Sequence, residues 1–552
     1  MSSGKRIVIV GGVAGGMSAA ARARRLDETA EITVLERTGY VSFANCGLPY
    51  YIGREIPEYD DLVLQTPQSL GARFNLDVRV SHEVRSIDRE KKTVSGMNLA
   101  CGSEFSLPYD ELILSVGAQP IKPPVPGLDN PGVFTLRNME DTAEIDGWIA
   151  EKQPKTAVVV GGGYIGIEMA EQLHNRGMKV HVVDGAPNIL PPFDSEMAEF
   201  AQAELRRNGL ELHLNAFLKE ISGDGGLAGT VKAGDSAISA DLVILGLGVR
   251  PDSRLAQEAG LDVGPRGGIQ VTPGMQTNDP NIWAVGDAIE VVNPITGEKV
   301  QIALGGPANR QGRIAANNIY GANDTYGGTI GTAILRVFDL QVGATGMKEA
   351  QLKQAGLPYE AIYLHPRHHA SYYPGSEPIH MKLLFNPENE KIYGIQAVGK
   401  AGVDKRVDVI ATAILADMKV SKLAELELSY SPPFGSAKDP INMAGMMAQN
   451  ILGGLLKQAQ WHEIPELDTE NEFLLDVRSE REVARFAIPG SVNIPLGDLR
   501  ERLSEIPKDK KVVVYCLTGQ RSYFASRVLA LNGYDARNLS GAWMTYSGAG
   551  LG

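Results

Sequence analysis

The chain has 552 residues, of which 43% are hydrophobic and 22% are charged, and its formal net charge at pH 7 is -13. This length exceeds what one hydrophobic core supports, so we expect about three to five domains. The negative charge argues against nucleic acid as a partner. Only 3 cysteines are present, which favours a reducing compartment such as the cytoplasm. We expect no signal peptide and no membrane-spanning segment, because no apolar stretch is long enough.

The first predicted unit is a strand, a glycine-rich loop and a helix. Residues 6–10 are a β-branched run typical of a buried parallel strand, and the small residues of 11–16 follow it. Such a loop lets backbone approach a pyrophosphate at a helix N-terminus, although Val13 replaces the middle glycine of G-x-G-x-x-G. A second strand, 31–35, ends in Glu36 as a ribose acceptor requires, which disfavours the alternative of a βαβ unit without a ligand. The candidate cofactor-binding residues are Gly11, Gly12, Val13, Ala14, Gly15, Glu36 and Arg37.

Cys46 lies in the next stretch, Val-Ser-Phe-Ala-Asn-Cys-Gly-Leu-Pro-Tyr-Tyr, at 41–51. We expect a helix to begin there, and a helix N-terminus stabilises the thiolate that attacks sulfur. No second cysteine follows within a few residues, so the second sulfur must come from a substrate. Cys46 is therefore a candidate nucleophile, and the alternative is a buried structural cysteine. Cys101 lies in a polar turn and has no expected role.

A second dinucleotide loop follows a β-branched strand at 156–160. Asp184 ends the next strand, where a carboxylate accepts the 2′-hydroxyl of NAD and repels the 2′-phosphate of NADP. No Arg or Lys follows in 185–188, so we expect NADH rather than NADPH. Two dinucleotide sites imply hydride transfer between two cofactors, with a flavin as the usual intermediary. The candidate NAD-binding residues are Gly161, Gly163, Tyr164, Ile165, Gly166 and Asp184.

Two further segments complete a family pattern. Residues 112–118 are a strand and a turn that contains Gly117, and 276–287 are a strand that ends in Gly-Asp. With the first loop they resemble the flavoprotein disulfide reductases that have two dinucleotide-binding domains, from residue 6 to roughly residue 450. The resemblance implies that Asp287 holds the ribityl chain of FAD. Within this superfamily, the sequence around Cys46 is most similar to the single-cysteine coenzyme A-disulfide reductases.

This resemblance implies an α/β chain of two Rossmann-like domains and an α+β dimerisation domain. We expect an FAD-binding domain at 1–118 and 250–325, an NAD(P)H-binding domain at 119–249 and a dimerisation domain at 326–450. The protein is then expected to be a homodimer.

Tyr372 and Tyr430 lie in segments that resemble signatures of the coenzyme A-disulfide reductases. The resemblance implies that both reach into the Cys46 site of a partner subunit, where a phenol can protonate a leaving thiolate. The alternative is that they only pack a dimer interface. His368 and His369 are expected on the solvent side.

The same resemblance implies a channel for coenzyme A that leads to Cys46. Cations are needed for its phosphates, although an arginine-rich helix face is often only solvated. The candidate residues are Ser42, Asn45, Arg22 and Arg25, with Arg24 on the same helix.

Residues 461–552 are predicted to form a separate α/β module after a linker at 451–460. A buried strand, 511–515, runs into a loop of six residues from Cys516 to Arg521, and a helix follows. This arrangement resembles a rhodanese domain. Backbone N–H groups that point into such a loop form an anion cradle, which favours a thiolate and can hold a persulfide. The alternative is an inactive module that only binds partners.

The two sulfur sites together predict one substrate class, the S–S bonds of persulfides, polysulfides and coenzyme A disulfide. In the expected cycle NADH reduces FAD, Cys46 attacks coenzyme A persulfide and hydrosulfide leaves, while Cys516 carries sulfane sulfur. One alternative is an NADH oxidase or peroxidase with an independent sulfurtransferase, although the first loop lacks the histidine of peroxidase relatives. Another is a redox-sensing regulator. No metal site is expected.

Overall fold

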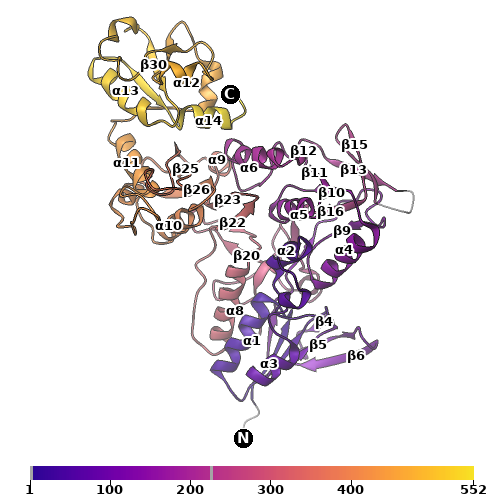
Figure 1. Cartoon of the computed structure of the whole chain (residues 1–552). Coiled ribbons are helices and arrows are strands. Elements are labelled where there is room, and N and C mark those ends of the chain that lie inside the picture. The colour runs from indigo at the N-terminus through magenta and orange to yellow at the C-terminus, as the bar shows by residue number, and fades with distance from the viewer. Residues whose placement is uncertain (1–3, 224–227) are drawn as a thin grey trace. The chain divides into compact units, whose positions relative to one another are not determined.

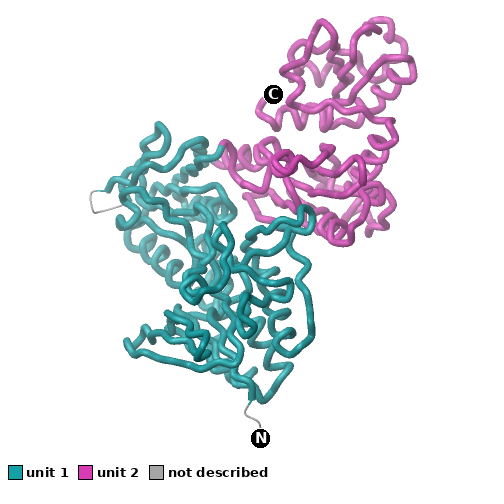
Figure 2. The backbone as a smooth tube through the Cα atoms, turned by 180° about the vertical axis from the view of Figure 1, so that it is seen from behind, with its two compact units in different colours: residues 1–186, 209–331 teal, residues 187–208, 332–552 magenta. Residues whose placement is uncertain are grey.

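The computed structural model describes residues 4–223 and 228–552, which divide into two compact units. Unit 1 comprises Met1–Ala186 and Gly209–Gly331, and unit 2 comprises Pro187–Asn208 and Thr332–Gly552 (Figure 2). Among the described residues, no helix combines the length and the apolar character needed to cross a bilayer.

The first sheet of unit 1 is parallel and has the order β19-β7-β1-β2-β3. Its strands are β1 (Arg6–Val10), β2 (Glu31–Leu35), β3 (Asp77–Arg79), β7 (Glu111–Leu114) and β19 (Ile282–Ala284). Helices α1 (Ala14–Leu26) and α8 (Gly305–Ile319) lie side by side (Figure 1). Their close packing requires a glycine at position 312, because a Cβ there would lie 2.2 Å from the Gly15 carbonyl oxygen. The carboxyl ends of β1, β2, β7 and β19 bring the predicted FAD segments to one edge of the sheet.

The second sheet is also parallel and has the order β12-β11-β10-β16-β9. Its strands are β9 (Val133–Phe134), β10 (Thr156–Val160), β11 (Lys179–Val183), β12 (Glu211–His213) and β16 (Leu242–Leu245). Helices α4 (Met139–Lys152) and α5 (Tyr164–Asn175) belong to the same part of the chain. The central strand β10 is almost completely buried, as its β-branched sequence predicts.

Smaller sheets, most of them antiparallel, complete unit 1. One meander is β4 (His82–Asp88), β5 (Thr93–Asn98) and β6 (Ser103–Pro108), and another is β13 (Leu218–Ser222), β14 (Gly229–Ala233) and β15 (Ser236–Ala240). The pair β8 (Ala118–Pro120) and β17 (Val249–Pro251) lies beside both predicted borders of the NAD(P)H-binding segment. A small sheet contains β18 (Ile269–Gln270), β20 (Ile289–Val292) and β21 (Lys299–Val300).

Unit 2 begins with an antiparallel sheet of order β22-β23-β26-β25-β24. Its strands are β22 (Ala333–Val337), β23 (Leu340–Gly346), β24 (Glu360–Leu364), β25 (Ile379–Phe385) and β26 (Ile392–Gly399), with helices α9 (Glu349–Gln354), α10 (Val403–Leu415) and α11 (Pro440–Leu452). Helix α6 (Ser195–Arg207) falls in the predicted NAD(P)H-binding segment but belongs to unit 2. The cause is the fully buried Lys382, whose Nζ lies 2.7 Å from Asp194, 2.6 Å from Glu196 and 2.7 Å from Glu349.

The C-terminal part of unit 2 has a parallel sheet of order β27-β31-β30-β28-β29. Its elements are β27 (Gln458–Ala459), β28 (Glu472–Asp476), β29 (Val492–Asn493), β30 (Lys511–Tyr515), β31 (Ala536–Leu539), α12 (Glu480–Val483), α13 (Gln520–Leu531) and α14 (Ala542–Gly548). Strand β27 lies inside the predicted linker, so the unpaired connection is shorter than expected. The predicted fold class is confirmed: two Rossmann-like sheets, an α+β segment and a C-terminal α/β module.

Candidate functional site

The first loop joins β1 to α1 with backbone that favours glycine. Gly11 has a φ of +103°, and a Cβ there would lie 2.1 Å from the Ser115 carbonyl oxygen. Val13 has a φ of -109°, so a side chain is tolerated where the family pattern has glycine. Ala14 and Gly15 open α1, whose first N–H groups are available to a phosphate.

Glu36 holds this loop from the end of β2. Its side chain is buried, and Oε2 accepts the Gly12 N–H at 2.8 Å while Oε1 accepts the Thr38 N–H at 2.9 Å. Oε1 also accepts the Thr38 hydroxyl at 2.9 Å, so Oε2 is the oxygen that keeps acceptor capacity for a ribose hydroxyl. Arg37 forms an ion pair with Asp252 at 3.2 Å.

The second loop repeats this geometry at the start of α5. Gly161 has a φ of +111°. Asp184 Oδ2 accepts the Gly162 N–H at 2.6 Å, and Oδ1 accepts the Ala186 N–H at 2.7 Å. The same carboxylate-to-loop contact therefore occurs in both halves of unit 1.

A cavity lies at the carboxyl ends of β10 and β11, next to Asp184. This cavity of about 320 Å³ is lined by Asp184 and by apolar residues that include Val183, Phe217 and Leu247. No Lys or Arg is among the lining residues that the structure describes. A Cβ on Gly163 would meet nothing within 4 Å, which leaves room for a ligand beside the loop.

The remaining residues of the second pattern have different tasks. A Cβ on Gly166 would lie 1.9 Å from the Gly161 carbonyl oxygen, so this glycine permits close helix packing. Tyr164 and Ile165 form the first turn of α5, and burial raises the pKa of Tyr164 to about 12. The Tyr164 phenol therefore stays protonated at neutral pH.

Asp287 follows β19 in a short 3-10 turn, Gly286–Ala288. Burial raises the pKa of Asp287, and the positive charge of Arg137 opposes this shift. The Arg137 side chain donates to Gln119 Oε1 at 2.7 Å and to the Val116 carbonyl at 3.3 Å. Arg137 is thus a cation beside the predicted flavin residues that the sequence patterns did not single out. Gly117, next to Val116, has a φ of +71°.

Cys46 is exposed and lies in a 3-10 turn, Asn45–Gly47, followed by the short helix α2 (Leu48–Ile52). Partial burial of its sulfur raises the pKa of Cys46, and the carboxylates of Glu168 and Asp287 raise it further. These surroundings oppose a negative charge on the sulfur, and the helix expected at this position is only one short turn. Stabilisation of the thiolate by a helix N-terminus stays a prediction.

The backbone around Ser42 connects the cysteine segment to the first loop. Ser42 has a φ of +48°, and its N–H donates to the Gly12 carbonyl at 2.9 Å. Asn45 is exposed beside Cys46. Helix α5 contacts the same segment, because the Tyr50 hydroxyl donates to Glu168 Oε1 at 3.1 Å.

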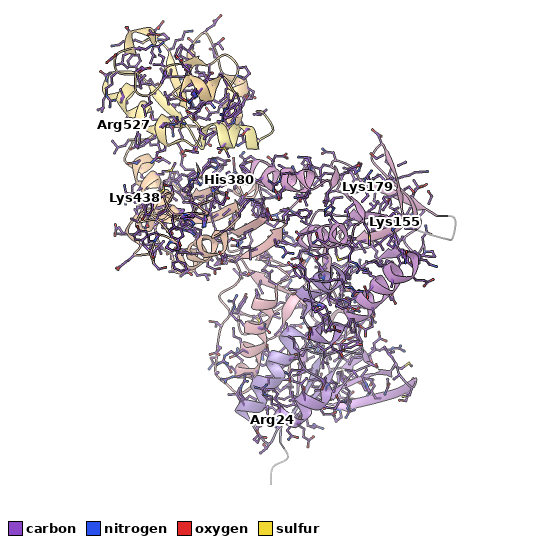
Figure 3. The ribbon with its side chains drawn as sticks, viewed as in Figure 1. Arg24, Lys155, Lys179, His380, Lys438 and Arg527 are labelled. Carbon is purple, nitrogen blue, oxygen red and sulfur yellow. The ribbon has the colours of Figure 1, made fainter. Side chains whose placement is uncertain are left out.

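The three arginines of α1 have unlike surroundings. Arg24, labelled in Figure 3, is 4% exposed. It donates to the carbonyls of Phe74, Asp27, Glu28 and Asn75. Arg24 therefore holds the end of the helix and is not available to bind a phosphate. Arg22 donates to Asn317 Oδ1 at 2.6 Å, whereas Arg25 is exposed.

Tyr372 and Tyr430 are brought together in unit 2, with their hydroxyl oxygens 3.3 Å apart. They are 74% and 50% exposed, and Phe434 nearby in sequence is 73% exposed. Paired aromatic side chains with this exposure are typical of an interaction surface. The expected solvent position of His369 is wrong, because this residue is 4% exposed.

The Cys516 loop forms an enclosed cradle. Cys516 is 0% exposed, and its Sγ accepts the Gly519 N–H at 3.2 Å. The Ser522 hydroxyl lies 3.4 Å from Sγ and 3.1 Å from the Gly519 carbonyl oxygen, so its single proton can turn to either acceptor. The Trp543 N–H donates to the Cys516 carbonyl at 3.1 Å, and the Met544 N–H donates to the carbonyl of the next residue at 3.0 Å. Helix α14 thus holds the loop through two backbone hydrogen bonds.

Two ion pairs flank this cradle. Arg521 binds both carboxylate oxygens of Glu482, at 2.8 and 2.6 Å, and this contact lowers the pKa of Glu482 to about 2. Asp476 and Arg478, both 0% exposed, form a second pair at 2.6 Å. The Arg478 guanidinium also lies 5.4 Å from the ring of Tyr515, the residue before Cys516.

Three family models match successive segments of the chain. A family model described as pyridine nucleotide-disulphide oxidoreductase matches residues 5–312, and the dimerisation domain of that family matches 332–439. A model of the rhodanese-like domain matches 461–549.

Individual relatives cover most or all of the chain. A coenzyme A disulfide reductase of Staphylococcus haemolyticus is 35% identical over 81% of this chain and 100% of its own length. An NADH oxidase of Methanocaldococcus jannaschii is also 35% identical, over 80% of this chain and 97% of its own.

Two solved structures include the C-terminal module. Reduced CoADR-RHD of Bacillus anthracis is 46% identical, with a TM-score of 0.97 over 99% of this chain and 98% of that one. An NAD-dependent persulfide reductase from A. fulgidus is 36% identical, with a TM-score of 0.92 over 98% of this chain and 100% of that one.

Proposed function

This chain belongs to the family of pyridine nucleotide-disulphide oxidoreductases, and we propose that it reduces the S–S bonds of persulfides and of coenzyme A disulfide. Its preferred substrate is coenzyme A persulfide or a related small persulfide. NADH is the electron donor and FAD the bound flavin. The similar proteins named as a coenzyme A disulfide reductase and a persulfide reductase support this assignment.

The residues present fit both dinucleotides. The first loop with Glu36, Arg137 and Asp287 would hold FAD. The N-terminus of α1 and the Arg137 cation suit its phosphates, and the carboxylates of Glu36 and Asp287 suit its hydroxyl groups. Asp184 and its cavity without Lys or Arg favour NADH over NADPH. Bound flavin supplies two-electron transfer from nicotinamide to sulfur.

Cys46 is the proposed nucleophile. Its thiolate attacks the sulfane sulfur of coenzyme A persulfide, so that a Cys46–sulfur bond forms, the S–S bond to coenzyme A breaks and coenzyme A leaves as a thiolate. Two electrons from NADH then cleave the Cys46 persulfide, releasing hydrosulfide and restoring the Cys46 thiolate. Coenzyme A disulfide reacts in the same way through a mixed disulfide.

The exposed tyrosine pair has a place in this scheme if the protein is a homodimer. We assign Tyr430, assisted by Tyr372, as the donor of a proton to the departing sulfur in the site of a second copy. Their mutual hydrogen bond raises the pKa of Tyr372, so its phenol is protonated at neutral pH. Ser42, Asn45, Arg22 and Arg25 are the proposed contacts of coenzyme A.

Cys516 is the proposed carrier of sulfane sulfur. Its cradle offers an N–H and a hydroxyl donor to an anionic sulfur. Arg521 supplies a positive charge, which is shared with Glu482. The three free thiols fit a reducing compartment.

One observation carries the proposal. The Ser42 N–H donates to the Gly12 carbonyl of the first dinucleotide loop at 2.9 Å, and the Tyr50 hydroxyl donates to Glu168 Oε1 of helix α5 at 3.1 Å. The segment that carries the exposed Cys46 is therefore bonded to both dinucleotide-binding parts of the chain. The described cysteines are all free, which supports a second sulfur that comes from a substrate.

Steady-state NADH consumption tests the function. We expect coenzyme A persulfide and coenzyme A disulfide to be turned over at least tenfold faster than peroxide or oxygen. The NADH oxidase relative makes the opposite order the specific alternative. Faster turnover with oxygen or peroxide would overturn the proposal, and negligible turnover with all four compounds would indicate a regulator.

A further inference from the structure

Three side chains capable of binding metal meet at the edge of the second sheet. Strands β11 and β12 are parallel neighbours, with His181 opposite Glu211 and Val183 opposite His213. Alternate residues of a strand point to the same face, so Glu211 and His213 share a face with His181. The three side chains project from two paired strands rather than from a flexible loop.

The distances between their ligand atoms match a metal site. His181 Nδ1 lies 3.1 Å from His213 Nε2 and 3.3 Å from Glu211 Oε2, and His213 Nε2 lies 4.0 Å from Glu211 Oε2. The point equidistant from these three atoms is about 2.1 Å from each, within the range of Zn–N and Zn–O bonds. A tetrahedral ion with such bonds separates its ligand atoms by about 3.4 Å, so binding would draw Glu211 Oε2 and His213 Nε2 about half an ångström closer. A proton on His181 Nδ1 explains the short distances from this atom to His213 Nε2 and to Glu211 Oε2. It does not explain the distance between His213 Nε2 and Glu211 Oε2.

The surroundings fix the positions of the ligands. His181 is 6% exposed, so the sheet packs around its imidazole. Lys179, labelled in Figure 3, lies 2.8 Å from Glu211 Oε1. The lysine therefore orients the carboxylate and leaves Oε2 facing the two imidazoles, while its own positive charge weakens the attraction for a cation.

A second cluster of possible ligands differs in one respect. Asp194, Glu196 and Glu349 also converge, but the Lys382 ammonium already lies among them within 2.7 Å of each. The cation that balances those carboxylates is thus part of the chain. At His181, Glu211 and His213 no lysine or arginine nitrogen occupies the equivalent central point in the described structure.

We propose that His181, Glu211 and His213 bind a late first-row divalent metal ion, with Zn²⁺ as the reference ion and water as a fourth ligand. Two imidazoles and one carboxylate suit such ions. This proposal departs from the expectation that the chain has no metal site, and it does not depend on the proposed function. No sequence spacing indicates the site, because its two strands are distant in sequence.

The site has a structural connection to the NAD pocket. The Asp184 N–H donates to the His213 carbonyl at 2.9 Å, and the Ala216 N–H donates to the Asp184 carbonyl at 2.8 Å. A bound ion would hold β12 against β11 beside the carboxylate that faces the ribose. Strand β12 leads to Phe217, which lines the cavity.

Equilibrium dialysis of the full-length, flavin-loaded protein against Zn²⁺ tests the proposal. Since thiols also bind Zn²⁺, the readout is the difference in bound metal between variants. We expect His213→Ala to bind one Zn²⁺ fewer per chain than the unchanged protein. His462→Ala removes an exposed histidine of the C-terminal module, and this control is expected to bind as much as the unchanged protein.

Two further variants keep the test decisive. Glu211→Gln, at an exposed position, is expected to weaken this one site at least about tenfold if His213→Ala fails to fold. Lys179→Met is expected to tighten it several-fold, because a positive charge is removed. Equal binding by the unchanged protein, His213→Ala and Glu211→Gln would overturn the proposal, as would equal losses in His213→Ala and His462→Ala.

Discussion

Cys46 and Cys516 are both proposed sulfur nucleophiles, yet the chain surrounds them in opposite ways. Cys46 is exposed, and Glu168 and Asp287 place negative charge near its sulfur. Cys516 is buried and receives hydrogen bonds from Gly519 and from a serine hydroxyl. The surroundings of Cys46 oppose a negative sulfur, whereas those of Cys516 offer it donors.

This difference indicates a division of labour. An exposed sulfur between two dinucleotide loops can receive a bulky thiol carrier and then electrons. An enclosed cradle protects a small sulfane sulfur from solvent and provides no path for electrons of its own. We therefore expect Cys46 to be essential for NADH-dependent reduction and Cys516 to be essential only for sulfur delivery.

Replacing each cysteine by serine in turn is expected to change activity the most. Cys46→Ser is expected to lower NADH-dependent turnover of coenzyme A persulfide by about 10³-fold or more, because the nucleophile is lost. Cys516→Ser is expected to keep that turnover within about twofold and to abolish sulfur transfer to cyanide. Stopped-flow absorbance of NADH and a cyanide assay measure the two activities. Equal losses of NADH turnover in both variants would show that the sites do not act independently.

Breaking the buried ion pair between Asp476 and Arg478 is expected to destabilise only the C-terminal module that contains Cys516. Asp476→Ala leaves the buried Arg478 without its carboxylate, which costs about 3–5 kcal/mol of folding free energy. Urea unfolding followed by the fluorescence of Trp461 and Trp543 is expected to show this loss. The exposed substitution Asp509→Ala is the control. A matching loss of bound flavin in Asp476→Ala would contradict the separation of the two regions.

Removing one donor of the cradle gives a smaller effect. Ser522→Ala deletes the hydroxyl that bonds Cys516 Sγ, and one such hydrogen bond contributes about 1 kcal/mol, or roughly fivefold in the rate of sulfur transfer. Ser526→Ala is a matched control, since its hydroxyl donates to the Tyr523 carbonyl instead. Unchanged transfer in Ser522→Ala would show that the backbone N–H groups alone hold the sulfur.

The smallest effect concerns the pH dependence at Cys46. Because the pKa of Cys46 is raised, the thiolate fraction and the rate are expected to increase with pH through neutrality. Glu168→Gln removes one negative charge, so the pKa falls and the increase moves to lower pH. The pH profile of single-turnover persulfide reduction measures the shift, with the exposed Glu151→Gln as control. A shift to higher pH would contradict the assigned electrostatics.

The sequence predicts the dinucleotide loops well because their chemistry is local. Glu36 and Asp184 each end a strand, and each accepts an N–H group from the preceding loop. Val13 departs from the pattern, and the loop is still identified because Glu36 follows at the expected spacing; its negative φ in the structure explains why a side chain is tolerated there. Spacing along the chain was sufficient for these residues.

Other features depend on contacts between distant segments. Arg137 acts on Asp287, and Lys382 draws α6 into unit 2, yet neither contact follows from periodicity or spacing. The carboxylates near Cys46 could not be predicted for the same reason, since Glu168 comes from another helix. Local sequence patterns identified Cys46 as a candidate nucleophile, but they could not predict which residues from other segments lie near it.

Mass spectrometry of Cys46 tests the central claim most directly. Cys516→Ser protein is mixed with coenzyme A persulfide in the absence of NADH, and the peptide that contains Cys46 is analysed after alkylation. We predict one added sulfur atom on Cys46, together with release of coenzyme A, and loss of that sulfur as hydrosulfide when NADH is supplied. Full NADH-dependent hydrosulfide production with no sulfur ever bound to Cys46 would contradict the account.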